Sequence, residues 1–207
     1  LRESLEKSPV VILQAPPGAG KSTLVPLELI DEPWLSRKKI VMLEPRRLAA
    51  RAVAGRMASL CELPIGDKIG YRIRFDTKVS DKTRIEVVTE GILTRLVQRD
   101  NTLEGIGLVI FDEFHERSLN ADLALALCLQ VQQLVRDDLR ILIMSATIDG
   151  EKLSSLLNNA PIITSLGKHY PVEHRYYNFD PEAKTPVRMA RAIRKALAEN
   201  KGDVLAF

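Results

Sequence analysis

The sequence predicts an α/β domain in which a mostly parallel sheet is covered by helices on both faces. The first observation is a set of runs rich in Val, Ile and Leu, at residues 10–14, 39–45, 84–90, 107–113, 140–147 and 161–165. They are almost continuously apolar, which is typical of strands buried on both faces. The second observation is that segments with helical periodicity lie between them, at about residues 21–30, 45–61, 90–99, 119–136 and 150–158. This alternation predicts parallel strands joined by right-handed crossovers.

Composition sets limits on partners and compartment. The chain has 207 residues, 45% of them hydrophobic, and 30 Lys and Arg against 27 Asp and Glu. A net charge of only +3 means that any nucleic-acid surface must be a local patch. No apolar run approaches the ~20 residues that span a bilayer, so we expect no membrane partner. Cys61 and Cys128 are isolated in apolar helical segments, and we expect two buried thiols in a reducing, cytoplasmic compartment.

The character of the sequence changes after about residue 166. Residues 167–183 are polar, aromatic and interrupted by prolines, which predicts a connector. A further helix follows, with Val187, Ala190, Ile193 and Leu197 on one face, and then a strand-like segment at 203–207. We therefore expect a first domain at 1–166, a connector at 167–183, and the truncated start of a second α/β domain at 184–207.

The segment GAGKST, residues 18–23, joins the first predicted strand to the helix after it. Ligands of parallel sheets bind at the carboxyl ends of strands, and glycines there allow backbone N–H groups to form a nest for phosphate. Lys21 can reach the outer phosphates and the Ser22 hydroxyl can bind Mg²⁺. The alternative is an ordinary glycine turn before a helix. The segment predicts a P-loop whose phosphate-binding residues are Gly18, Ala19, Gly20, Lys21, Ser22 and Thr23.

A later predicted strand ends in two carboxylates, Asp112 and Glu113. Asp112 is suited to hold Mg²⁺, and Glu113 to position and deprotonate an attacking water. Taken alone, such a pair after a strand is more often a helix cap. Together with Lys21 it predicts nucleotide hydrolysis, with Ser22, Asp112 and Glu113 as the metal-site residues.

Six motifs, in order, resemble those of superfamily 2 helicases of the DEAH-box class: GAGKST, EPRRLAARAVAGR, GYRIRF, VVTEGIL, DEFHERSLNADLALAL and MSAT. The resemblance covers essentially the whole chain, since GKHYPVEHRYY is similar to the link between lobes and GDVLAF to the first strand of the second lobe. It implies a RecA-like P-loop NTPase domain that uses ATP and Mg²⁺ to move along a single strand. The chain departs from the pattern at Ala15 and Phe114, where the class has Gly and Ala.

The resemblance also implies the partners of this domain. They are a single-stranded nucleic acid and a second RecA-like lobe of the same chain. Phosphate contacts alone do not distinguish RNA from DNA, and the family favours RNA. Because related helicases keep arginines that reach the γ-phosphate in their second lobe, we expect these 207 residues alone to hydrolyse ATP poorly. The alternative function is a nucleotide-switched remodelling module that does not unwind.

Several arginines take roles from the resemblance. Similar helicases place residues equivalent to Arg46 and Arg47 against the nucleic-acid backbone, and the alternative is surface charge on a helix. Arg56 matches a position that stacks on adenine, which its planar cation suits, and the alternative is a solvated arginine. Arg72 and Arg74 share one face of a strand or turn. Related helicases contact the single strand there, which favours Arg74; an ordinary edge hairpin is the alternative.

The remaining candidates surround these motifs. Thr89, Glu90 and Gly91 lie at a strand end and helix start, where they can grip phosphates, and the alternative is a plain helix cap. Ser145 and Thr147 resemble a motif that couples hydrolysis to movement, and their hydroxyls are expected to bond to His115; buried hydroxyls capping a strand are the alternative. His115 is expected to be a coupler and not a metal ligand, because no Cys or second His lies at ligand spacing. The predicted catalytic set is Lys21, Asp112, Glu113 and His115.

Overall fold

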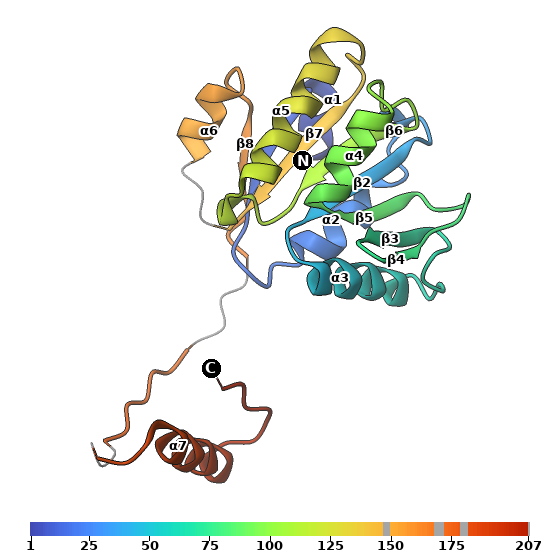
Figure 1. Cartoon of the computed structure of the whole chain (residues 1–207). Helices are drawn as coiled ribbons and strands as arrows, with labels where there is room; N and C mark the ends of the chain where they lie inside the picture. The colour runs from blue at the N-terminus through green and yellow to red at the C-terminus, as the bar shows by residue number, and fades with distance from the viewer. Residues whose placement is uncertain (147–149, 168–171, 179–181, 207) are drawn as a thin grey trace. The chain divides into compact units, whose positions relative to one another are not determined.

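The computed structural model describes residues 1–146, 150–167, 172–178 and 182–206. Its contacts divide the chain into two compact units, Leu1–Lys168 and His169–Phe207. The first unit contains the sheet and most of the helices (Figure 1). No helix in the described residues is long and apolar enough to cross a membrane.

The sheet of the first unit is parallel except at one edge. Its strands are β1 (Val10–Gln14), β2 (Lys39–Glu44), β3 (Ile69–Ile73), β4 (Asp76–Lys78), β5 (Ile85–Thr89), β6 (Ile106–Phe111), β7 (Arg140–Ser145) and β8 (Ile162–Thr164). They lie in the order β4-β3-β5-β2-β6-β7-β1-β8, and only the β3–β4 pair is antiparallel. The mostly parallel sheet predicted from the apolar runs is therefore confirmed. The edge hairpin, one of two alternatives for residues 70–78, is also present.

Helices cover both faces of this sheet (Figure 1). They are α1 (Arg2–Lys7), α2 (Lys21–Leu29), α3 (Arg47–Leu60), α4 (Glu90–Arg99), α5 (Leu119–Leu134) and α6 (Gly150–Leu156), with 3-10 turns η1 (Pro33–Leu35) and η2 (Phe114–Glu116). Helices α2 to α6 follow the predicted periodic segments. Helix α1 and the two turns were not predicted, because each is too short to show a period.

Two hydrophobic cores explain why the strands read as continuous apolar runs. In β1, Val10 and Ile12 belong to the core under α4, α5 and α6. Val11 and Leu13 belong to the core under α1, α2 and α3. Successive strand residues point to opposite faces, so a sheet covered twice needs an apolar residue at every position.

The cysteines differ from the expectation of two buried thiols. Cys128 lies on α5 and is buried, and burial raises its thiol pKa to about 12. Cys61 is exposed, so the prediction for this residue was wrong. The reason is its position, because Cys61 caps the carboxyl end of α3 beyond the stretch that packs on the sheet. Both thiols are free.

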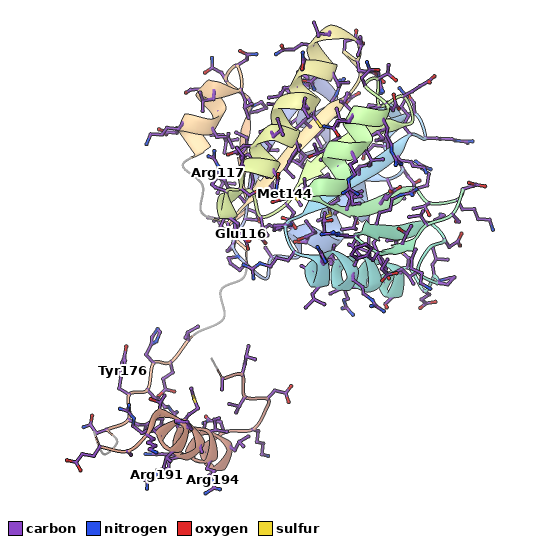
Figure 2. All side chains as sticks on the ribbon, viewed as in Figure 1. Glu116, Arg117, Met144, Tyr176, Arg191 and Arg194 are labelled. Carbon is purple, nitrogen blue, oxygen red and sulfur yellow. The ribbon has the colours of Figure 1, made fainter. Side chains whose placement is uncertain are left out.

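The second unit contains α7 (Thr185–Glu199), the helix predicted from its apolar stripe. None of its residues is buried within the described structure, and Arg191 and Arg194 extend from it (Figure 2). The strand expected at 203–207 is not found, since residues 203–206 are exposed and form neither helix nor strand, and Phe207 lies outside the described residues. A strand is held by backbone hydrogen bonds to a neighbour, and the described residues of this unit provide none.

Candidate nucleotide-binding site and nucleic-acid interface

The carboxyl ends of five parallel strands bring the predicted site residues to one edge of the sheet. In spatial order these strands are β5, β2, β6, β7 and β1. The GAGKST segment follows β1, Asp112 and Glu113 follow β6, and Thr89 ends β5. The strand order therefore places the P-loop on one side of the carboxylates and residues 89–91 on the other.

The P-loop has the backbone geometry that the glycines predict. Gly18 and Gly20 both adopt φ of +78°, in the left-handed region. Gly20 is also the N-cap of α2, and a Cβ there would lie 2.9 Å from Leu24 Cδ1. Glycine takes this conformation without strain, and such a turn can form a nest of backbone N–H groups for an anion. The free N–H groups and the helix dipole favour an anion at this position.

Lys21 connects the P-loop to the carboxylates. Its side chain is only 5% exposed, and its Nζ donates to Glu113 Oε1 at 2.7 Å. Glu113 is 29% exposed, so the pair lies at the opening of the site. The structure thus brings together the predicted phosphate-binding lysine and the predicted water-positioning carboxylate.

Asp112 is suited to bind a cation together with Ser22. It is 2% exposed, and its Oδ1 accepts the Glu113 N–H at 2.8 Å. Its Oδ2 is buried and has no hydrogen-bond partner among the described residues. Burial raises the pKa of Asp112, and the nearby Ser22 hydroxyl opposes that shift. A buried oxygen without a partner, beside a hydroxyl, fits the oxygen ligands that Mg²⁺ prefers.

The protein provides only part of a metal coordination shell here. Within the described residues, no group of three or more His, Cys, Asp or Glu side chains could hold a metal ion. Mg²⁺ is commonly held by one or two carboxylates together with substrate phosphates and water. The residues at this site therefore fit Mg²⁺ that arrives with a nucleotide.

Glu44 is a further carboxyl at this edge that sequence reasoning missed. It is the last residue of β2 and is 2% exposed. Burial, followed by the charge and hydrogen bond of Asp112, raises its pKa to about 9. Glu44 is therefore protonated at neutral pH. Asp112 favours the protonated form of Glu44, because two neighbouring negative charges repel.

His115 lies between Glu113 and the end of β7. Its Nδ1 is 3.3 Å from Glu113 Oε2 and 3.5 Å from the backbone nitrogen of Ala146. Sequence reasoning expected the Ser145 and Thr147 hydroxyls as its partners. The contact that the structure describes is with the amide of Ala146, the residue between them. Ser145 is fully buried, and Thr147 lies outside the described residues.

The loop after β6, residues 112–118, has an unusual backbone conformation around η2. We call it the β6 loop. Glu113 and Arg117 adopt φ of +48° and +44°, which non-glycine residues rarely take. Phe114, where the class pattern has Ala, is buried and packs edge-on against Phe111 with ring centroids 6.1 Å apart. The large ring at position 114 thus anchors the loop in the core and leaves Asp112 and Glu113 at the site.

A cavity of about 280 Å³ gathers most of the predicted nucleic-acid residues. Its lining includes Arg47, Arg74, Thr89, Glu90 and Gly91. We call it the basic groove, defined by the residues Pro45, Arg47, Arg74, Thr89, Glu90, Gly91, Ile92 and Arg95. Three separate motifs therefore meet at one surface, next to the carboxylates of the β6 loop.

Arg95 in the basic groove was not predicted. It lies on α4 four residues after Gly91, so both residues are on the same face of the helix. That spacing is the signal in the sequence that could have identified it. Its guanidinium adds a third positive charge to the groove.

Arg46 and Glu90 make contacts with the β6 loop. Arg46 Nη2 lies 3.0 Å from Glu116 Oε1, in an ion pair whose Arg46 side chain is 73% exposed. Glu90 Oε1 accepts the Ser118 hydroxyl at 2.6 Å, and Ser118 caps α5. Glu116 lies on that loop with Arg117 (Figure 2). These contacts give Glu90 a structural partner and leave Arg46 in a weak surface pair.

Arg72 and Arg56 lie outside the basic groove. The guanidinium of Arg72, which was expected on the same face as Arg74, pairs with Glu86 on the neighbouring strand β5. The Arg72 side chain therefore links strand β3 to strand β5. Arg56 is exposed on α3, which packs against α2, and makes no ion pair with any described residue. It remains a candidate for contact with the adenine.

Comparisons with known proteins agree with this geometry. The family model described as DEAD/DEAH box helicase matches residues 2–156. The ATP-dependent RNA helicase HrpB of Escherichia coli (strain K12) is 52% identical over 207 residues, which is 100% of this chain and 26% of that protein. The ATP-dependent RNA helicase HrpA of the same strain is 40% identical over 212 residues, covering 99% of this chain and 16% of that protein.

A solved structure supports the same likeness. The crystal structure of Escherichia coli DEAH/RHA helicase HrpB matches with a TM-score of 0.87 and 52% identity, over 97% of this chain and 25% of that chain. The predicted RecA-like P-loop fold is confirmed by this match. The chain spans about a quarter of the length of these HrpB proteins.

Proposed function

The chain belongs to the DEAD/DEAH box helicase family, and from that premise we propose that it is the ATP-binding lobe of an ATP-dependent RNA helicase. In this proposal, residues 1–166 are the first RecA-like domain, residues 167–183 the connector, and residues 184–207 the start of a second RecA-like domain. The whole protein would hydrolyse ATP to move along a single strand, in the cytoplasm. The names of the HrpB and HrpA relatives, both ATP-dependent RNA helicases, support the choice of RNA.

The observation that carries the proposal is the direct contact between Lys21 and Glu113. The 2.7 Å contact between this lysine and this carboxylate supports a site in which a phosphate cradle and a hydrolytic group would surround one small space. The glycine nest and the amides of α2 would bind the phosphates, and Lys21 would leave Glu113 to contact the outer ones. Arg56 would stack on the adenine.

Each polar residue around the Lys21–Glu113 contact has a distinct part in the proposed hydrolysis. Ser22 and Asp112 would hold Mg²⁺, which when bound neutralises charge on the phosphates. Glu113, once released by Lys21, would orient a water and accept its proton. His115, in contact with both Glu113 and the end of β7, would transmit the state of the site to residues after Ser145.

The proposed path of the single strand is the basic groove. Arg47, Arg74 and Arg95 would contact its phosphates, as would the backbone at Thr89 and Gly91. Arg46 would join them after leaving Glu116. Because an exposed ion pair contributes about 0–1 kcal/mol, this exchange costs little.

The test is steady-state phosphate release by the full-length protein, with and without single-stranded RNA or DNA of the same sequence. Stimulation by RNA, and strand separation of an RNA duplex, are the expected results. Stimulation without strand separation would support the alternative of a nucleotide-switched remodelling module. Absence of ATP hydrolysis under all conditions would contradict the proposal.

A further inference from the structure

The β3–β4 hairpin exposes an aromatic ring at its tip. Arg74 and Phe75 are the two residues between Ile73 and Asp76, which form the last pair of the ladder. The Phe75 side chain is 90% exposed, while the phenylalanines of the β6 region are buried. A phenyl ring left in water contributes nothing to the hydrophobic stabilisation of the fold.

The backbone at the tip is also unfavourable for this residue type. Phe75 adopts φ of +69°, and this is the second residue of a two-residue turn. Turns with a left-handed second residue favour Gly or Asn there, and a bulky side chain is strained. Exposure and conformation thus both make Phe75 a poor choice for folding. Local rules broken in this way are typical of functional positions.

The ring is held next to the basic groove. Arg74, which lines the groove, places its Cζ 4.7 Å from the centroid of the Phe75 ring. This cation covers one face of the ring, and the high exposure shows that the rest is open to a ligand. Arg74 therefore links the phosphate-binding surface to the aromatic tip.

The hairpin itself is fixed to the body of the domain. Asp76 Oδ2 accepts the hydroxyl of the buried Tyr71 at 2.7 Å and lies 3.8 Å from Arg51 on α3. A tip anchored one residue from Phe75 presents the ring in a defined direction, which lowers the entropy cost of stacking.

We propose that Phe75 stacks on a base of the single strand whose phosphates occupy the basic groove. The inference rests on the proposed function, and it adds a contact to the bases where the groove provides contacts to phosphates. A positively charged groove beside an aromatic ring is the usual design for binding single strands. Since every base has a π-face, the contact would add affinity with little sequence preference.

The test compares Phe75→Gly and Phe75→Trp in the full-length protein without nucleotide. The probes are a fluorescein-labelled single-stranded oligoadenylate and the same backbone with abasic residues, titrated by fluorescence anisotropy. Phe75→Gly should weaken binding to the oligoadenylate about 5- to 10-fold and leave binding to the abasic strand unchanged. Phe75→Trp should keep the wild-type affinity. The salt slope of Phe75→Gly should equal that of the wild type, because stacking releases no counterions.

Stability separates a stacking role from a structural one. Glycine relieves the strained φ, so Phe75→Gly should melt at the wild-type temperature or above it. Leu134→Ala removes another exposed apolar side chain, outside the basic groove, and should leave binding to both strands unchanged.

The outcomes are distinct for the two proposals. If the wild type binds neither strand, the proposed function fails. If the wild type binds and Phe75→Gly binds the oligoadenylate equally well, only the stacking inference is overturned. An equal loss on the base-bearing and abasic strands overturns it as well, because the ring would then act through the phosphate contacts.

Discussion

Replacing Glu113 by Gln should tighten the binding of ADP, because the Glu113 carboxylate holds the lysine that we propose binds the nucleotide phosphates. Lys21 Nζ donates to Glu113 Oε1 at 2.7 Å, and the lysine is 5% exposed. A bound diphosphate must compete with this carboxylate for the ammonium group. A glutamine amide at this position carries no charge and would release Lys21 at lower cost. The same substitution should abolish hydrolysis, because an amide cannot accept the proton of water.

The size of the effect follows from the exposure of the pair. A hydrogen bond to a charged group contributes about 1.5–3 kcal/mol to stability. Glu113 is 29% exposed, which favours the lower end, and the glutamine amide oxygen can still accept one hydrogen bond from Lys21. The net gain is then about 1 kcal/mol, or about fivefold in the dissociation constant of ADP.

Isothermal titration with ADP and Mg²⁺ measures this directly, and ADP avoids turnover. The matched control is Glu28→Gln, which makes the same charge change at the far end of α2, where Glu28 pairs with Arg2 at the surface. That variant should bind ADP like the wild type. Wild-type or weaker affinity in Glu113→Gln would refute the reasoning, because it would mean that the Lys21 contact does not compete with the nucleotide.

Four further substitutions test other parts of the site. Lys21→Ala should abolish binding of ADP with Mg²⁺ and leave the circular dichroism unchanged; retained affinity would contradict the P-loop assignment. The raised pKa of Glu44 means that the folded state holds a proton that the unfolded state releases, so stability falls as pH rises from about 4.5 to about 9. Glu44→Gln should flatten that decline in urea unfolding measured from about pH 6 to about pH 9, and an unchanged slope would contradict it. Arg47→Ala and Arg74→Ala should each weaken single-strand binding for all base sequences and lower the salt slope by about one unit or less, whereas an unchanged slope would favour plain surface charge.

The sequence was sufficient for the central sheet because each buried strand carries its own signal. Val10 to Leu13 are apolar at every position, and this predicts helices on both faces wherever the strand lies in the sheet. The strand predicted at 203–207 is absent from the described residues 203–206 for a different reason. Its apolar residues resemble a buried strand, but pairing depends on a neighbouring strand that the described residues of its unit lack.

The geometry of the candidate site was predictable where it depends on local backbone, as at Gly18 and Gly20, which both adopt a positive φ. It was less predictable where function depends on side chains brought together by the strand order. In the sequence, Glu44 looks like an ordinary polar residue at the end of a strand. Its pKa is raised by burial and by Asp112, which lies nearby because β2 and β6 are neighbouring strands. Arg72 and Arg74 look equivalent in the sequence, yet pairing with Glu86 in the sheet separates their roles.

The β6 loop contacts both proposed ligand sites, and this has a consequence for their energetics. Glu113 pairs with Lys21 of the P-loop, while Glu116, three residues later, pairs with Arg46 at the nucleic-acid side. A cavity of about 260 Å³ lies between them, lined by Arg46, Asp112, Glu113 and Glu116, among others. A nucleotide that takes Lys21 and a strand that takes Arg46 would each remove one of the contacts that hold this loop. Because binding linkage is reciprocal, any change in strand affinity caused by the nucleotide must be matched by an equal change in nucleotide affinity caused by the strand. Glu116→Gln should reduce that mutual effect by weakening the Arg46 pair, which makes the segment from Asp112 to Ser118 the place where coupling between the sites is expected.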